Sequence, residues 1–217
     1  MDGYSVTIPH KEAVIPLLDE IEPLARRIGA VNTIVTRDGR LCGSNTDWSA
    51  AVKAIEDALP AGESLRGRRV LLVGAGGAAR AIAFGLIERG CRVTIANRTK
   101  ERGVRLAADV GCTCVDLAAA GSVPYDVLVN GTSVGMHPNV DATPLAQGLL
   151  RPGALVFDSV YNPLQTRLLR EARGAGCRTV DGLAMFVNQA AQQFELWTGA
   201  PAPRELMRAV VESRLQR

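Results

Sequence analysis

The chain contains few of the residues on which metal centres, disulfide networks and aromatic cores depend. Histidine occurs only as His10 and His137, so a histidine-rich metal site is excluded. The five cysteines form no C-x-x-C pair, and their odd number predicts reduced thiols rather than a disulfide framework. Aromatic residues make up 4% of the 217 residues, so the core must be built from Ala, Val, Leu and Ile.

Charge and hydropathy exclude two further classes of partner. The net charge is only +3 and the basic residues form no extended run, which argues against nucleic-acid binding. No apolar run approaches the length of a membrane span, and the polar first residues, with Asp2 among them, are unlike a signal peptide. We therefore expect a cytoplasmic protein, with no membrane partner, that acts on a small-molecule substrate.

From about residue 68 onward, strand-like and helix-like segments alternate. The stretch "RRVLLVGAGGAARAIAFGLIERG" predicts a buried strand, a tight glycine turn and a helix. Further strands are predicted in "RVTIANR", "YDVLVNGTSVG", "ALVFDSVYNP" and "RTVDG", and further helices in "TKERGVRLAADVG" and "LQTRLLREARGAG". Alternating short strands and helices are typical of the α/β class, with a parallel sheet and right-handed crossovers.

The first residues and the end of the chain predict a smaller α/β unit. Asp38-Gly39 lies between two apolar runs and indicates the turn of a β-hairpin, and "PAGESLRG" is typical of a linker. The other predicted elements are a strand at 4–9, a mostly helical stretch at 11–29, and helices at 48–59, 184–198 and 203–216.

The glycine turn predicts a dinucleotide site. It fits G-x-G-x-x-A, and it follows a strand and opens a helix, as such sites require. Gly74 permits the tight turn, Gly76 lets the backbone approach a pyrophosphate, and Ala79 keeps the helix close to the strand. The helix N-terminus then offers free N–H groups to the phosphates. The alternative is a turn that serves packing alone. The residues predicted to bind cofactor here are Gly74, Ala75, Gly76, Gly77 and Ala78.

The end of the next strand indicates which dinucleotide is bound. An NAD site usually has Asp or Glu there to accept hydrogen bonds from the ribose, but the sequence is Asn97-Arg98-Thr99-Lys100. Arg98 can bind a 2′-phosphate with a planar, charged fork, and Asn97 and Thr99 can add neutral hydrogen bonds. We therefore predict NADP rather than NAD, although a solvated basic turn would have the same composition.

A nicotinamide enzyme that reduces a ketone also needs a proton donor beside the carbonyl. Lys11 follows a strand and a proline, and Asp47 ends "GSNTD" just before a helix. A Lys–Asp pair in a partly dry cleft could hold a proton, and the ammonium could stabilise charge on the substrate oxygen. Taken singly, Lys11 is equally typical of a surface lysine, and Asp47 of a helix N-cap.

Several motifs occur together and in one order along the whole chain. They are "SVTIPHK", "GAVNT", "GSNTD", "GAGGAAR", "NRT", "NGTSVGM", "DSVYNP" and "DGLAMFVNQAAQQFELWTG". With these motifs the chain resembles the shikimate dehydrogenase family over essentially its full length. "YSVTIPHKEA" is most similar to the dehydrogenase half of the bifunctional dehydroquinate dehydratase–shikimate dehydrogenases.

The resemblance implies a reversible, NADP-dependent reduction of 3-dehydroshikimate to shikimate, a step toward chorismate and the aromatic amino acids. It implies that Lys11 and Asp47 are the catalytic pair. It also implies fusion to, or pairing with, a 3-dehydroquinate dehydratase domain. The implied substrate-binding residues are Thr7, Asn32, Thr46, Tyr161, Gln189 and Gln193; the implied cofactor-binding residues beyond the glycine turn are Asn97, Arg98, Thr99, Thr132, Gly182 and Met185.

The implied architecture is a Rossmann-like NADP-binding domain at 48–183 and a smaller substrate domain at 1–47 with 184–217, with a cleft between them. The family has a strand, a helix and a strand before V-T-x-P-H-K, carrying a Ser-x-Ser motif that binds the substrate carboxylate. Nothing here matches that region, so we expect an incomplete substrate domain, through a truncated gene model, a natural fragment or a wrong start codon. Weaker binding of an anionic substrate would follow, by about 1.5–3 kcal/mol per lost charged bond.

Two other functions are consistent with parts of this pattern. A non-catalytic NADP-binding remnant would bind cofactor without turnover. An NAD-dependent quinate/shikimate dehydrogenase is the nearest alternative enzyme, and "NRT" argues against it. Methylene-tetrahydrofolate dehydrogenase and glutamyl-tRNA reductase share the architecture, but "VYNP" and "DGLAM" argue against both.

Overall fold

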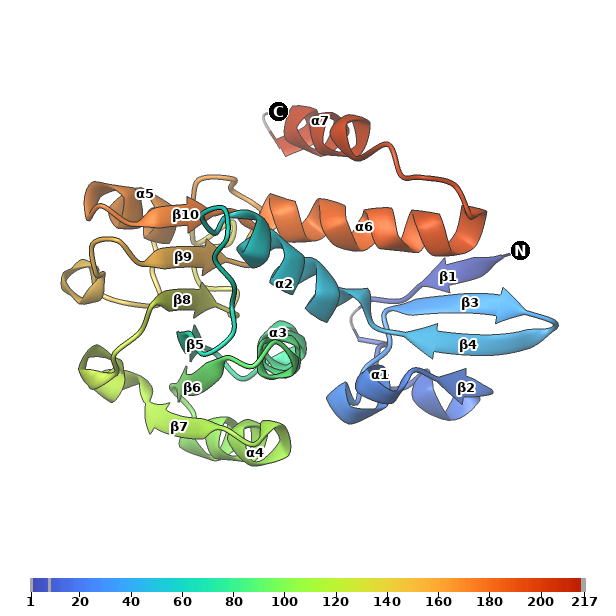
Figure 1. Ribbon diagram of the computed structural model, residues 1–217, viewed down its shortest axis with the longest axis horizontal. Helices are drawn as coiled ribbons and strands as arrows, with labels where there is room; N and C mark the ends of the chain where they lie inside the picture. Colours follow the sequence, from blue (N-terminus) through green and yellow to red (C-terminus); the bar gives the residue numbers. More distant parts are fainter. Residues whose placement is uncertain (1, 8, 216–217) are drawn as a thin grey trace.

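The chain forms two β-sheets that lie side by side and are joined by two long helices (Figure 1). The structure is a computed structural model that describes residues 2–7 and 9–215. The six-stranded sheet is at the left of Figure 1 and the four-stranded sheet at the right. Within the described residues, no helix is long and apolar enough to cross a membrane.

The six-stranded sheet is parallel throughout. Its strands are β5 (Arg69–Val73), β6 (Arg92–Asn97), β7 (Thr113–Asp116), β8 (Val127–Asn130), β9 (Leu155–Asp158) and β10 (Arg178–Val180). The order β7-β6-β5-β8-β9-β10 is that of the doubly wound dinucleotide-binding sheet. The strand order reverses between β5 and β8, and such sheets bind ligands at this point, at the carboxyl ends of the strands. The predicted α/β class is confirmed.

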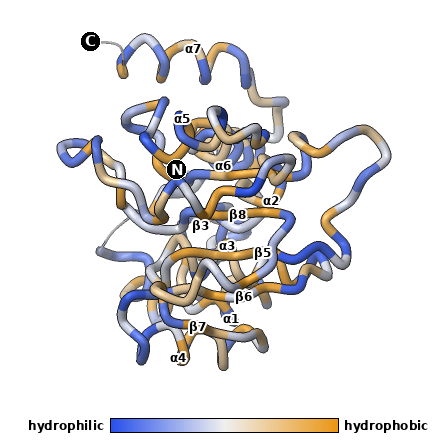
Figure 2. The backbone as a smooth tube through the Cα atoms, turned by 90° about the vertical axis from the view of Figure 1, so that its left-hand side faces the viewer, coloured by the Kyte–Doolittle hydropathy of each residue, from blue (hydrophilic) through white to orange (hydrophobic). Residues whose placement is uncertain are grey.

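Helices cover both faces of this sheet. Alternate residues of β5 point to opposite faces, so Leu72 packs with α3 (Gly77–Glu88) and α4 (Lys100–Val110), whereas Leu71 packs with α5 (Arg167–Gly174). The strands are hydrophobic in Figure 2 because both faces are buried. The sheet therefore supplies a rigid base for the loops at its carboxyl edge.

The four-stranded sheet has the order β1-β3-β4-β2. Its strands are β1 (Gly3–Ser5), β2 (Glu20–Ile21), β3 (Thr33–Arg37) and β4 (Arg40–Ser44). The hairpin between β3 and β4 is confirmed, with Asp38 and Gly39 at φ of 50° and 76°. Two positive φ values in a two-residue loop match the type I′ turn that suits strand twist.

Three segments differ from the sequence prediction. The strand predicted at 4–9 is formed as β1 only to Ser5, and residue 8 lies outside the described residues. Residues 11–29 are not mostly helical: they hold the 3-10 helix η1 (Ile15–Leu17), β2 and the short helix α1 (Pro23–Ile28). Pro16 and Pro23 explain the difference, because proline lacks a backbone donor and disfavours helix in the residue before it. Strand β7 was not predicted, since it is short and carries polar residues at both ends.

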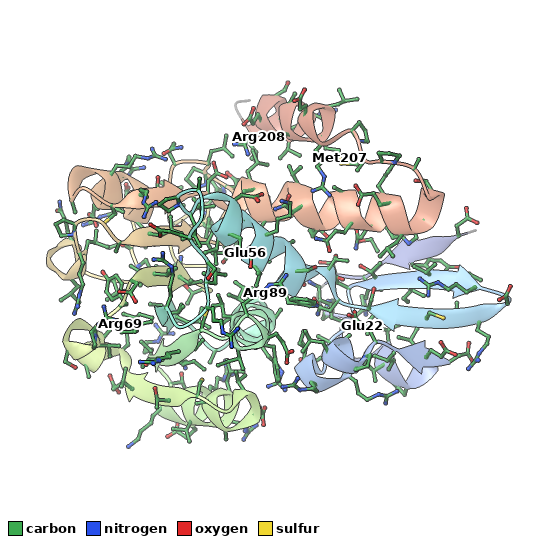
Figure 3. The ribbon with its side chains drawn as sticks, in the orientation of Figure 1. Glu22, Glu56, Arg69, Arg89, Met207 and Arg208 are labelled. Carbon is green, nitrogen blue, oxygen red and sulfur yellow. The ribbon has the colours of Figure 1, made fainter. Side chains whose placement is uncertain are left out.

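Two helices connect the sheets. Helix α2 (Thr46–Asp57) starts beside the small sheet, and α6 (Gly182–Thr198) starts at the large sheet and ends by the small one (Figure 1). They pack against each other, and Asn188 Nδ2 of α6 donates to the Ala50 carbonyl of α2 at 3.3 Å, while Ser49 Oγ donates to Gln192 Oε1 at 2.6 Å. Figure 3 shows Glu56 of α2 beside Arg89 at the end of α3, an ion pair of 3.2 Å. The remaining elements are η2 (Leu117–Ser122), η3 (Gln147–Leu149) and α7 (Arg204–Leu215).

The reversal point of the large sheet is closely packed. Gly74, at φ 115°, approaches the loop after β8 so closely that a Cβ would lie 2.7 Å from Cγ2 of Thr132. A Cβ on Gly131 would lie 2.8 Å from Cβ of Ala79. The start of α3 can sit between the ends of β5 and β8 only because these positions lack side chains.

We predict that Gly131→Ala destabilises the fold by roughly 1–3 kcal/mol, since the new methyl group must displace α3. Urea denaturation would measure the free energy of unfolding. Gly148→Ala is the matched control, because Gly148 is exposed and a Cβ there meets nothing within 4 Å. Equal stabilities of the two variants would contradict the prediction.

A buried carboxylate links the loops that follow β8 and β9. Asp158 is fully buried and accepts hydrogen bonds from Asn130 Nδ2 (2.9 Å), the Val160 amide (3.0 Å) and Thr166 Oγ1 (2.6 Å). Asn130 in turn accepts from the Thr132 hydroxyl at 2.6 Å. Burial raises the pKa of Asp158, and these hydrogen bonds oppose the rise. The network fixes both loops at the carboxyl edge of the sheet.

The raised pKa gives a testable pH dependence. The unfolded chain releases the Asp158 proton from about pH 4 upward, before the folded chain does, so this group lowers stability as pH rises through that range. Asp158→Asn cannot titrate. We expect the stability difference, variant minus parent, to move in favour of the variant between acidic and neutral pH, as measured by urea denaturation. A difference that is constant with pH would contradict this.

Candidate active site

A cleft of about 680 Å³ lies between the small sheet and the start of helices α3 and α6. One wall comes from the segments around β1 and β3, and the other from the glycine turn and the first turns of α6. The predicted site residues that line it are Thr7, Lys11, Asn32, Asp47, Gly77, Ala78, Tyr161, Gly182, Met185 and Gln189.

Lys11 and Asp47 form an ion pair in this cleft. Lys11 Nζ lies 2.7 Å from Asp47 Oδ2, and the side chains are only 26% and 15% exposed. Asp47 is free for this contact because Asn45 caps α2 instead, accepting from the Asp47 amide at 2.9 Å. The N-cap alternative for Asp47 is therefore wrong. A half-buried lysine beside a carboxylate can donate a proton as the ammonium and take one up as the neutral amine.

The side chain of Asn32 holds the carboxylate in place. Its Nδ2 donates to Asp47 Oδ1 at 2.9 Å and to Thr46 Oγ1 at 3.0 Å, and its Oδ1 accepts from the Thr46 amide at 2.8 Å. Gln193 Nε2 donates to the Asn32 carbonyl at 3.1 Å and to Thr33 Oγ1 at 2.9 Å. Thr46 and Gln193, predicted to bind substrate, do not line the cleft: both are 4% exposed and lie behind Asn32.

The opposite wall brings α6 against the loop after β9. A Cβ on Gly182 would lie 2.5 Å from the Val160 carbonyl oxygen, so this contact requires glycine. Tyr161 stacks on Phe186 with ring centroids 4.7 Å apart. Met185 and Gln189 follow on the cleft side of α6. Apolar and polar side chains thus share one wall.

The other predicted cofactor residues lie outside this cleft, along the carboxyl edge of the large sheet. Asn97 ends β6, next to the end of β5, and its Nδ2 donates to the Thr99 carbonyl at 2.7 Å. Arg98 and Thr99 are exposed beside it, and Thr132 packs on Gly74. These residues lie along the carboxyl edge of the large sheet, from the cleft to the end of β6.

The geometry of this edge fits a dinucleotide. Positions Gly76 and Gly77 have open space where a Cβ would stand, so a ligand can reach the backbone. The first turn of α3 carries N–H groups without intrahelical partners. The exposed guanidinium of Arg98 suits an additional phosphate. Residues Gly76 to Ala78 and Asn97 to Thr99 are therefore the ones that would hold NADP.

Sequence reasoning did not find several residues of the site. Asn45, Ser159 and Phe186 line the cleft, and Asn45 also donates from Nδ2 to the Ala30 carbonyl at 2.9 Å. The signal for Asn45 was its place immediately before a helix, which is typical of an N-cap. Ser159 and Phe186 carry no such local signal.

Three family models match the chain. Residues 1–34 match "Shikimate dehydrogenase substrate binding domain", residues 56–139 match "Shikimate / quinate 5-dehydrogenase", and residues 182–212 match "Shikimate 5'-dehydrogenase C-terminal domain".

Named relatives and solved structures agree with these models. The bifunctional 3-dehydroquinate dehydratase/shikimate dehydrogenase of Arabidopsis thaliana is 50% identical over 94% of the chain, and the chain spans 36% of its length. The NADP(+) shikimate dehydrogenase of Geobacillus kaustophilus is 46% identical over 97% of the chain, which spans 78% of its length.

A crystal structure of the Thermus thermophilus shikimate 5-dehydrogenase with NADP(H) and shikimate has a TM-score of 0.88 and 40% identity. It is matched by 98% of this chain, which covers 79% of that protein. Similarity of this extent, over both sheets and all three family models, shows that the chain belongs to the shikimate dehydrogenase family.

Proposed function

We propose that this protein is an NADP-dependent shikimate dehydrogenase that reversibly reduces 3-dehydroshikimate to shikimate in the synthesis of chorismate and aromatic amino acids. The observation that carries the proposal is the Lys11–Asp47 pair, 2.7 Å apart, on the wall of a cleft whose other wall begins at Gly77. The division into a substrate domain (1–47, 184–217) and an NADP-binding domain (48–183) belongs to the proposal, and is supported by the separation of the two sheets.

NADP, when bound, supplies the hydride donor or acceptor. In the reducing direction, Lys11 Nζ donates a proton to the substrate carbonyl oxygen; in the oxidising direction it takes the proton from the hydroxyl. Asp47 Oδ2 accepts a hydrogen bond from Lys11 Nζ and so keeps the ammonium beside the substrate oxygen.

The other cleft residues bind and orient the substrate. Thr7 and Gln189 present a hydroxyl and an amide group to a polyol, and Tyr161 is held in place by Phe186. Asn32, also on the cleft wall, acts by orienting the Asp47 carboxylate. Thr46 and Gln193 act through Asn32, which the hydrogen bonds behind the cleft support.

Two finer features belong to the same proposal. Pairing with a 3-dehydroquinate dehydratase, on one chain or two, is supported by the bifunctional name of the Arabidopsis relative. A cytoplasmic location is supported by the five cysteines, all of which are free.

We expect the purified protein to oxidise shikimate with NADP, measured by NADPH absorbance. We further expect Lys11→Met to lower kcat by about 10²–10⁴, the usual contribution of an acid/base group, while NADP affinity stays unchanged. Lys53→Met is the control, because Lys53 is exposed on α2 and pairs only with Asp57 at 2.9 Å among the described residues. NADP binding without turnover by the parent would overturn the proposal in favour of a non-catalytic remnant.

Arg98→Ala should weaken NADP binding about tenfold or more, through loss of a charged hydrogen bond of about 1.5–3 kcal/mol, and leave NAD binding nearly unchanged. Fluorescence titration with both dinucleotides would measure this. Arg105→Ala, an exposed change further along α4, is the control. Equal loss for both dinucleotides would contradict the 2′-phosphate role, and faster turnover of quinate with NAD would identify the alternative enzyme.

A further inference from the structure

Arg80 connects the glycine turn to the small sheet. It lies in the first turns of α3, and its amide donates to the Gly76 carbonyl at 2.8 Å. Gly77 and Ala78 on the same turn line the cleft. Its side chain leaves the large sheet and crosses to α1, which neighbours α3 in Figure 1.

The guanidinium caps the end of α1. Nε donates to the Ile28 carbonyl and Nη2 to the Arg27 carbonyl at 3.2 Å, while Nη1 pairs with Asp109 at 2.6 Å. The last carbonyls of a helix have no intrahelical partner, and a cation is favourable there. Arg80 also lies over the Phe84 ring, 5.2 Å from its centroid. Two of these four side-chain contacts, those with the Arg27 and Ile28 carbonyls, therefore fix where α1 ends.

The segment directly after α1 holds the Lys11–Asp47 pair. Gly29, at φ 73°, ends the helix. The carbonyl of the next residue, Ala30, accepts from the Asn45 side chain, and the Val31 amide donates to the Lys11 carbonyl at 2.8 Å. Asn32 then bonds the Asp47 carboxylate. Residues 28–32 therefore run from Arg80 to both members of the pair.

We propose that Arg80 is a positioning residue that couples the cofactor-binding turn of α3 to the Lys11–Asp47 pair. This inference deepens, and rests on, the proposed function. Phosphates bound at the first turn of α3 would hold that turn in one conformation. Through its contacts with the end of α1, Arg80 would then hold residues 30–32 in a fixed position relative to that turn. Without Arg80, each half of the site would still bind its ligand, but their relative position would no longer be fixed.

The principal test compares Arg80→Gln with the control Arg27→Gln. Arg27 lies at the same α1–α3 contact, where its side chain pairs with Glu88 at 2.5 Å, but that side chain bonds no carbonyl of α1. For Arg80→Gln we expect kcat for shikimate oxidation to fall about tenfold or more, as misplacement in a site does, with the Kd of NADP within threefold of the parent. Arg27→Gln should match the parent in both.

Hydrogen exchange supplies a readout that does not depend on turnover. Adding NADP to the parent and to Arg27→Gln should slow exchange at the Val31 amide. In Arg80→Gln the same saturating NADP should leave that exchange rate unchanged. A purely structural role would instead speed exchange equally with and without NADP.

A second variant covers the case in which Arg80→Gln does not fold. Arg80→Lys keeps the charge but presents one donor group, so we expect a smaller loss of kcat, about threefold to tenfold, and weakened NADP protection of Val31. Parent-like kcat and parent-like protection in the folded Arg80 variants would overturn the inference. A parent that shows the protection but does not oxidise shikimate would instead refute the proposed function and leave the coupling standing.

Discussion

The site depends on the fully used hydrogen-bonding capacity of one amide, that of Asn32. Its side chain is buried and binds Asp47, Thr46 and Thr33, while its backbone binds Val6, Ser44 and Gln193. A buried amide with all donors and acceptors paired has one orientation, because any rotation leaves a polar group unsatisfied. Asn32 therefore fixes the orientation of the Asp47 carboxylate, and the carboxylate in turn fixes the position of the Lys11 ammonium.

On the cofactor side, the site depends instead on positions that carry no side chain. Gly74, Gly131 and Gly182 lie where a Cβ would meet neighbouring atoms at 2.5–2.8 Å. The backbone packs closely against its neighbours at these three positions, whereas Gly76 and Gly77 leave open space at the first turn of α3. One wall of the cleft therefore carries hydrogen-bonded polar side chains that hold a proton donor, and the other combines the backbone at Gly77 with side chains of α6 such as Met185 and Gln189.

Local patterns in the sequence predicted the large sheet, the hairpin at Asp38-Gly39 and the connecting helices, because strand and helix periodicity and turn chemistry are properties of neighbouring residues. They could not predict contacts between distant residues. Gln193 lies 161 positions from Asn32, and Arg80 lies 52 positions from Ile28. The residues next to Gln193 and Arg80 in the sequence therefore do not indicate these partners. The motif match placed Thr46 and Gln193 at the substrate, whereas their hydrogen bonds place them behind Asn32. The prediction of a mostly helical stretch at 11–29 is wrong because Pro16 and Pro23 divide it into short elements.

Helix α6 limits how the two walls can move. Its first turns carry Met185 beside the large sheet, and near its end Trp197 donates to the Ile34 carbonyl of the small sheet at 2.9 Å. A continuous helix of 17 residues spans roughly 25 Å and does not shorten or kink without breaking backbone hydrogen bonds. The walls can therefore rotate about α6 but cannot translate along it. The cleft can widen or narrow at its mouth while the spacing between Met185 and Trp197 along α6 stays constant.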